Sequence, residues 1–101
     1  MNSIKKLRRF DQWLKKLKDI KAKIAIARRI DRMKDGNFGD CKYLGDSLYE
    51  LRIGIGPGYR VYFIKEKETI VIILLGGDKS TQQRDITLAK KIAKGLNDDC
   101  E

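Results

Sequence analysis

Two alternating segments joined by a glycine-rich pentapeptide constrain the fold of this 101-residue chain more than any other feature. In residues 48–53 and again in residues 59–65, apolar and polar side chains alternate with a period of two, which is typical of strands with one buried face. Between them, GIGPG at residues 54–58 contains the residue types that favour a chain reversal. The pattern therefore predicts an antiparallel hairpin in the middle of the chain.

The chain before this hairpin has a helical period instead. Between residues 10 and 33, apolar residues recur every three or four positions, and Asp11 and Gly36 are the predicted cap and stop. The charged residues around Lys18 either continue one helix or form a tight turn between two. We favour a helical hairpin, because each half has its own apolar stripe.

Further elements follow the same logic. Residues 41–44 predict a short strand, and residues 2–9 are compatible with another. Residues 69–75 are apolar on both faces, which indicates a central or helix-covered strand that Gly76 and Gly77 end. Ser80 or Thr81 then caps a final helix, with Ser80 and Gln83 at the spacing of a capping box. We predict an α+β fold of two N-terminal helices, an antiparallel sheet of three to four strands and a C-terminal helix, in one domain over residues 1–101.

Charge and composition limit the kinds of partner and of catalysis that are compatible with the sequence. The chain carries 23 Lys and Arg against 14 Asp and Glu, which gives a net charge of +9. This charge suits a protein that binds a polyanionic partner, but a basic protein without such a partner has the same composition. The absence of histidine excludes His-based triads and paired-His acid–base catalysis. Cys41 and Cys100 fit no metal-ligand spacing, so we predict reduced thiols, no metal and no cofactor. No apolar run is long enough to span a bilayer and no secretory signal is evident, which predicts a cytoplasmic protein without membrane attachment.

Alternation also predicts where cations gather. If Leu51 and Val61 face the core, then Arg52 and Arg60 emerge on the opposite face of neighbouring strands, with Tyr62 beside them. Two guanidiniums sharing one surface need an acid or a bound anion between them. Glu50 supplies the acid if this is a salt-bridged surface, whereas a phosphate is the anion if the arginines form a binding site.

Lys79 is the third predicted cation of this surface. It follows the last strand and precedes a helix N-terminus, whose free amide groups also favour an anion. The simpler interpretation is a solvated loop lysine beside a capping Asp78.

Two motifs then carry a resemblance. YELRIGIGPGYRVYF (residues 49–63) and LLGGDKSTQQRDI (residues 74–86), in this order of elements, resemble the RelE/ParE superfamily of bacterial toxins, and most of all its HigB-like "addiction module killer" branch. The similarity extends over nearly the whole chain. It implies a type II toxin that cleaves mRNA in the ribosomal A site, without a metal, and that a cognate antitoxin of helix-turn-helix (HigA-like) type silences. By position, the resemblance makes Arg52, Arg60 and Lys79 the catalytic cations.

Other roles stay open at this point. The candidate RNA-binding residues are Tyr62, Lys65 and Gln82. The tyrosine or histidine that some family members use for proton transfer has no clear counterpart in the last helix. We therefore assign Glu50 and Asp85 as the possible acid or base. Two alternatives remain: a ParE-like inhibitor of DNA gyrase without nuclease activity, and a noncatalytic RNA-binding protein.

Overall fold

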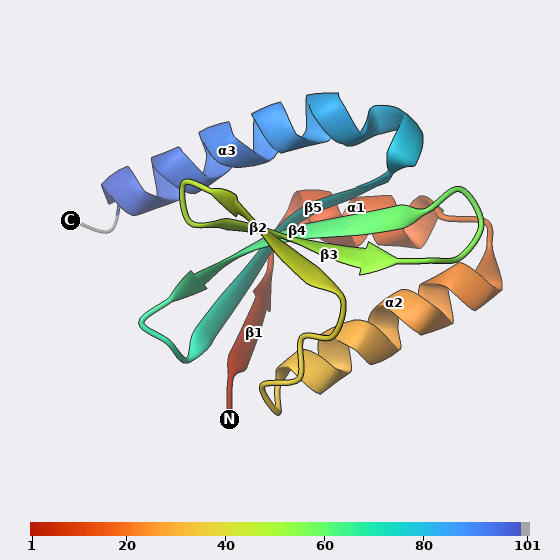
Figure 1. Cartoon of the computed structure of the whole chain (residues 1–101), viewed down its shortest axis with the longest axis horizontal. Coiled ribbons are helices and arrows are strands. Elements are labelled where there is room, and N and C mark those ends of the chain that lie inside the picture. The colour runs from red at the N-terminus through yellow and green to blue at the C-terminus, as the bar shows by residue number, and fades with distance from the viewer. Residues whose placement is uncertain (100–101) are drawn as a thin grey trace.

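A five-stranded sheet with helices on both faces forms the protein (Figure 1). The computed structural model describes residues 1–99, and Cys100 lies outside them. In chain order the elements are β1 (Ser3–Lys6), α1 (Arg8–Lys16), α2 (Ile20–Met33), β2 (Cys41–Gly45), β3 (Leu48–Ile53), β4 (Tyr59–Glu66), β5 (Ile70–Asp78), a 3-10 turn (Lys79–Thr81) and α3 (Gln82–Asp99). The predicted α+β class, helical hairpin and central β-hairpin are confirmed.

The sheet order is β1-β5-β4-β3-β2, and β1 pairs in parallel with β5 while every other pair is antiparallel. Our expectation of three to four strands was therefore too low, because the short opening segment adds an edge strand to β5. A parallel pair needs a long crossover, and the chain between β1 and β5 supplies it, because it contains both N-terminal helices and strands β2, β3 and β4.

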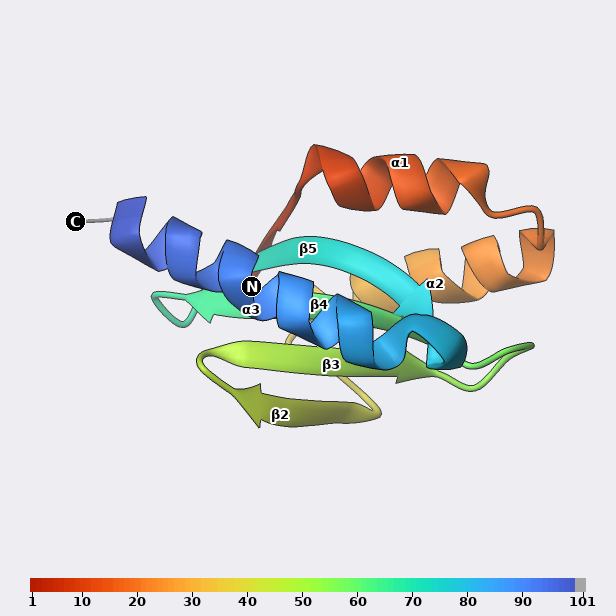
Figure 2. The ribbon, with the colours of Figure 1, turned by 90° about the horizontal axis from the view of Figure 1, so that it is seen from above.

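Helices cover the two faces of the sheet unequally, as Figure 2 shows, with α1 and α2 on one face and α3 on the other. One core cluster joins α1 and α2 to the odd-numbered residues of β3 and β4, among them Leu51, Val61 and Phe63. The other lies under α3 and includes Leu48, Tyr62 and Ala93, among others. The alternation predicted from the sequence is thus confirmed: residues 50, 52, 60 and 62 belong to the α3 side.

Strand β5 continues through the two glycines that we expected to end it. A bulge makes this possible, because Tyr62 pairs with Leu75 and Phe63 with Ile73, which leaves Leu74 as the extra residue. Leu74 and Leu75 both pack under α3, and the side-chain direction beyond the bulge is reversed. Gly76 consequently faces Trp13 of α1.

Trp13 packs directly on the backbone of Gly76. A Cβ added there would lie 2.3 Å from the indole ring, so Gly76→Ala should destabilise the fold by about 2–3 kcal/mol through overpacking. Gly95 of α3 is the matched control: it has open space, so Gly95→Ala should stabilise by about 0.5–1 kcal/mol. Chemical unfolding followed by the fluorescence of Trp13, the sole tryptophan, measures both. Equal effects of the two substitutions would contradict this packing.

The helix caps differ from those predicted. Helix α1 begins at Arg8, before the predicted cap Asp11, because the Leu7 backbone N–H is already held by the Ile73 carbonyl at 2.9 Å. Before α3, the capping box joins Asp78 and Thr81 rather than Ser80 and Gln83. A contact with β5 accompanies the earlier start of α1, whereas the cap before α3 is formed by local bonds among Asp78, Ser80 and Thr81. No helix in residues 1–99 combines the length and the apolar content that crossing a bilayer requires.

Candidate functional site

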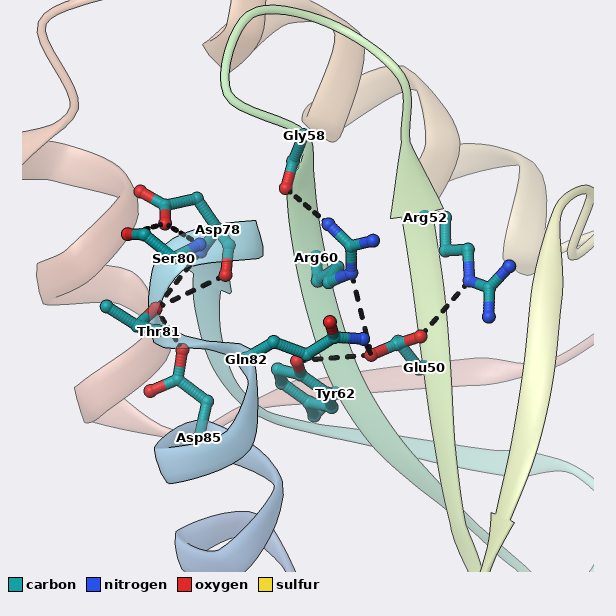
Figure 3. Close-up of polar contacts among 10 residues, drawn as sticks. All are labelled: Glu50, Arg52, Gly58, Arg60, Tyr62, Asp78, Ser80, Thr81, Gln82 and Asp85. Atoms are coloured by element: carbon teal, nitrogen blue, oxygen red, sulfur yellow. Dashed lines mark hydrogen bonds and ion pairs between the residues drawn. The ribbon is translucent and has the colours of Figure 1, made fainter.

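A buried carboxylate, Glu50 on β3, organises the polar residues on the α3 side of the sheet (Figure 3). Its side chain is 1% exposed, and Arg52 Nε donates to its Oε1 at 3.1 Å. The Tyr62 hydroxyl and the Gln82 amide donate to its Oε2 at 3.2 Å and 2.8 Å. A charge buried this deeply needs such donors, since an unpaired carboxylate would be strongly unfavourable.

Arg60 lies above the same carboxylate. It is the direct cross-strand partner of Arg52, and its Nε is 3.7 Å from Glu50 Oε2. That Nε atom is buried without a hydrogen-bond partner among the described residues, while Nη1 donates to the Gly58 carbonyl at 2.7 Å. One carboxylate thus faces two guanidiniums, so it cannot neutralise both.

Lys79 approaches this pair from the 3-10 turn after β5. Gly58 lies between them: a Cβ added to Gly58 would be 3.1 Å from Arg60 Nη1 and 3.7 Å from the Lys79 Cβ. The Lys79 side chain is exposed and takes part in no hydrogen bond or ion pair within residues 1–99. The structure therefore brings the three cations singled out by alternation and by the strand end to one end of β3, β4 and β5.

The turn that carries Lys79 is held by two acids. Asp78 accepts from the Ser80 backbone N–H at 2.8 Å and from the Ser80 hydroxyl, and these bonds lower the pKa of Asp78. Asp85, 5% exposed, accepts from the Thr81 hydroxyl at 2.5 Å. A Cβ on Gly77 would lie 1.9 Å from the Asp85 carboxylate, so only glycine lets this acid sit on the strand.

The candidate acids and bases are all occupied by hydrogen bonds within the protein. Glu50 accepts three hydrogen bonds and also pairs with Arg60, and Asp85 accepts a hydrogen bond from Thr81. Burial, followed by the neighbouring Glu50, raises the pKa of Tyr62 well above that of a free tyrosine, so Tyr62 is a neutral hydrogen-bond donor at pH 7. None of these three groups is placed as a free base. No group of three metal-binding side chains lies together in residues 1–99.

The raised pKa of Tyr62 predicts how the stability of the protein changes at alkaline pH. The unfolded chain loses this proton near pH 10 while the folded chain retains it, so the wild type should lose stability relative to Tyr62→Phe as the pH rises above about 10. Absorbance at 295 nm should show no difference between the two folded proteins near pH 10, where a free tyrosine loses its proton. An extra wild-type step near pH 10 in the folded protein would show that Glu50 and burial do not hold the proton.

The two other candidate RNA contacts, Gln82 and Lys65, lie on opposite faces of the sheet. Gln82, a candidate RNA contact, lies within the cluster and supports Glu50. Lys65, the other, lies on the opposite face, where its Nζ is 4.2 Å from the Phe38 ring and 4.6 Å from the Tyr49 ring. The structure does not bring it to the cluster, because its odd number places it on the α2 side of β4.

Two supporting residues had no signal in the sequence. Arg29 of α2 donates to the backbone carbonyl of Arg52 at 2.6 Å, which anchors the end of β3 from behind. The Gly58 carbonyl orients Arg60. Cys41 is a free thiol whose pKa is raised by burial, and it lies on β2, outside the cluster.

The chain is similar to a known protein family and to a protein of another organism. The family model for phage-derived Gp49-like proteins (DUF891) matches residues 12–96, which contain all the residues of the cluster. An uncharacterized protein of Haemophilus influenzae (strain Rd) is 53% identical over 87 residues, covering 86% of this chain and 88% of the relative.

Proposed function

The chain belongs to the phage-derived Gp49-like family, and we propose that it is the toxin of a type II toxin–antitoxin system that cleaves mRNA on the ribosome. The family is associated with toxins of the RelE/HigB kind, which makes an antitoxin the expected partner. We further propose that residues 1–101 form one toxin domain that acts in the cytoplasm. The observation that supports the proposal is that Glu50 pairs with both Arg52 and Arg60, and that Gly58 lies between Arg60 and the Cβ of Lys79.

The reaction that suits these groups is internal transesterification of RNA. The ribose 2′-hydroxyl loses its proton as its oxygen attacks the adjacent phosphorus, and the bond to the 5′-oxygen of the next nucleotide breaks. That 5′-oxygen takes up a proton, so the products are a 2′,3′-cyclic phosphate and a 5′-hydroxyl. The transition state carries additional negative charge on the phosphoryl oxygens, and preorganised cations stabilise it. Arg60 and Lys79 lie on either side of Gly58, and Glu50 holds both guanidiniums in place before substrate arrives.

Proton transfer is the part of this reaction that the cluster supports least. Glu50 and Asp85 are buried and occupied, and Tyr62 is a neutral phenol that donates to Glu50. We therefore propose that the ribosome aligns the 2′-hydroxyl with the phosphate, since positioning of this kind lowers barriers by several kcal/mol, roughly 7–11 in favourable cases. This favours a ribosome-dependent enzyme over an independent ribonuclease.

Mapping of RNA ends in cells tests the proposal. After induction of the full chain, we expect new mRNA 5′ ends in register with codons and none in untranslated RNA. Gyrase-linked DNA breaks without RNA cleavage would instead identify a gyrase inhibitor. RNA binding without either product would identify a noncatalytic RNA-binding protein.

A further inference from the structure

The outer side of α2 exposes apolar side chains that the fold does not bury. Ile20 is 70% exposed and Ile24 is 48% exposed, and exposed Ala27 continues the same stripe at helical spacing. The helix buries a separate stripe against the sheet, namely Ala22, Ile26, Ile30 and Met33. Packing of the chain on itself therefore does not explain Ile20 and Ile24.

Two arginines continue this surface toward the end of the helix. Arg28 and Arg32 are exposed, lie four residues apart, and form no ion pair or hydrogen bond among residues 1–99. Like charges at this spacing destabilise a helix. By contrast, Arg29 between them donates to three backbone carbonyls, and Asp31 pairs with Lys34 at 3.3 Å.

The same arginines line two hollows beside the helix. One, of about 280 Å³, lies between α2 and the end of β3 and has apolar walls from Ala25, Ile53 and Ile55. The other, of about 400 Å³, is lined by Ala27, Arg28, Asp31 and Arg32. Ile55 is itself 37% exposed, so apolar surface continues from the helix onto the β3–β4 loop.

We propose that this α2 outer face, defined by Ile20, Ile24, Ala27, Arg28 and Arg32, is the docking surface for an acidic amphipathic helix of a partner protein. Apolar side chains of that helix would cover the isoleucines, and its carboxylates would pair with the two arginines. A nucleic acid fits less well, because it has no aliphatic side chains to cover Ile20 and Ile24, and Asp31 repels phosphate in the second hollow. Identifying the partner as the antitoxin rests on the proposed function; the docking itself does not.

The surface is separate from the cationic cluster. Helix α2 packs on one face of the sheet, whereas Glu50, Arg60 and Gln82 lie on the other, under the start of α3 (Figures 2 and 3). Changes at exposed Arg28 and Arg32 should therefore affect docking without altering the cluster.

The test uses the full chain and two pools of labelled 18-residue helical peptides. Both pools carry varied Leu, Ile, Met and Phe on one face, one pool has Glu at the flanking positions, and the other has Lys. Fluorescence anisotropy should show binding of the Glu pool only. Arg28→Glu with Arg32→Glu should weaken it at least about tenfold and create binding of the Lys pool. The matched control, Lys91→Glu with Lys94→Glu on exposed α3, has the same net charge and should leave Glu-pool binding unchanged.

Several outcomes would overturn the docking proposal. The first is that the Glu pool does not bind the wild type, and the second is that both double variants lose equal affinity for it. The third is that the wild type binds a single-stranded RNA 20-mer, and that the Arg28/Arg32 variant loses this RNA binding but still binds the peptides. Toxicity of the Arg28/Arg32 variant, assayed in parallel, reports on the proposed function separately. If the wild type is not toxic but the peptide results hold, the toxin proposal fails and the docking surface stands.

Discussion

We expect that replacing Arg60 and Lys79 together with alanine abolishes toxicity while the chain stays folded. In the proposed reaction each cation would stabilise charge that develops only in the transition state, and removal of one such preorganised group costs on the order of 10²-fold or more in rate. The loss from both is expected to be larger than either single loss. Growth after induction and cleavage of a translated mRNA measure the effect.

The fold should survive these substitutions. Glu50 keeps Arg52, Tyr62 and Gln82 as donors when Arg60 is removed, and exposed Lys79 forms no contact that the fold needs. Arg9→Ala with Lys16→Ala, two exposed cations of α1, removes the same residue types and should leave toxicity intact. Full toxicity of a folded Arg60/Lys79 variant would refute the site.

Glu50→Gln should have the largest effect on stability among single polar substitutions in the cluster. The glutamine amide would present a donor group to donors already directed at this position, and two guanidiniums would lose their shared anion. Removing one partner of a buried ion pair costs about 3–5 kcal/mol. We expect a value near the lower limit, about 3 kcal/mol, because the Arg52 side chain is 39% exposed and water partly compensates it.

Asp31→Asn is the matched control for that substitution. Asp31 also forms an ion pair, with Lys34, but its side chain is 75% exposed, so its loss should change the free energy of unfolding by no more than about 0.5 kcal/mol. Urea unfolding of both variants gives the comparison. A Glu50→Gln protein as stable as Asp31→Asn would mean that the buried carboxylate does not hold the arginines.

The sequence predicted the parts of the site that depend on alternation. A period of two places Arg52, Arg60 and Tyr62 on one face, and the hairpin then makes the arginines direct partners. It also identified Glu50 as the acid between them. Glu50 pairs with both arginines, as the salt-bridged alternative predicted, whereas the phosphate-binding alternative stays a prediction.

Other features depend on contacts between distant residues and left no local pattern. The bulge at Leu74 sets which way Gly76 and Gly77 face, and it follows from packing under α3 rather than from propensity. The bond from Gln82 to Glu50 joins residues 32 positions apart. Lys65 illustrates the converse, because charge suggested an RNA contact while its strand register places it over aromatic rings on the other face.

The chemistry of the RNA ends tests the central claim most directly. In a purified translation system containing the full chain, we expect cleavage of the translated mRNA to give 5′-hydroxyl and 2′,3′-cyclic phosphate ends, and the Arg60→Ala/Lys79→Ala protein to give neither. Ends carrying a 5′-phosphate, or equal cleavage by the wild type and the folded double variant, would contradict a cluster of Arg52, Arg60 and Lys79 that acts on the scissile phosphate.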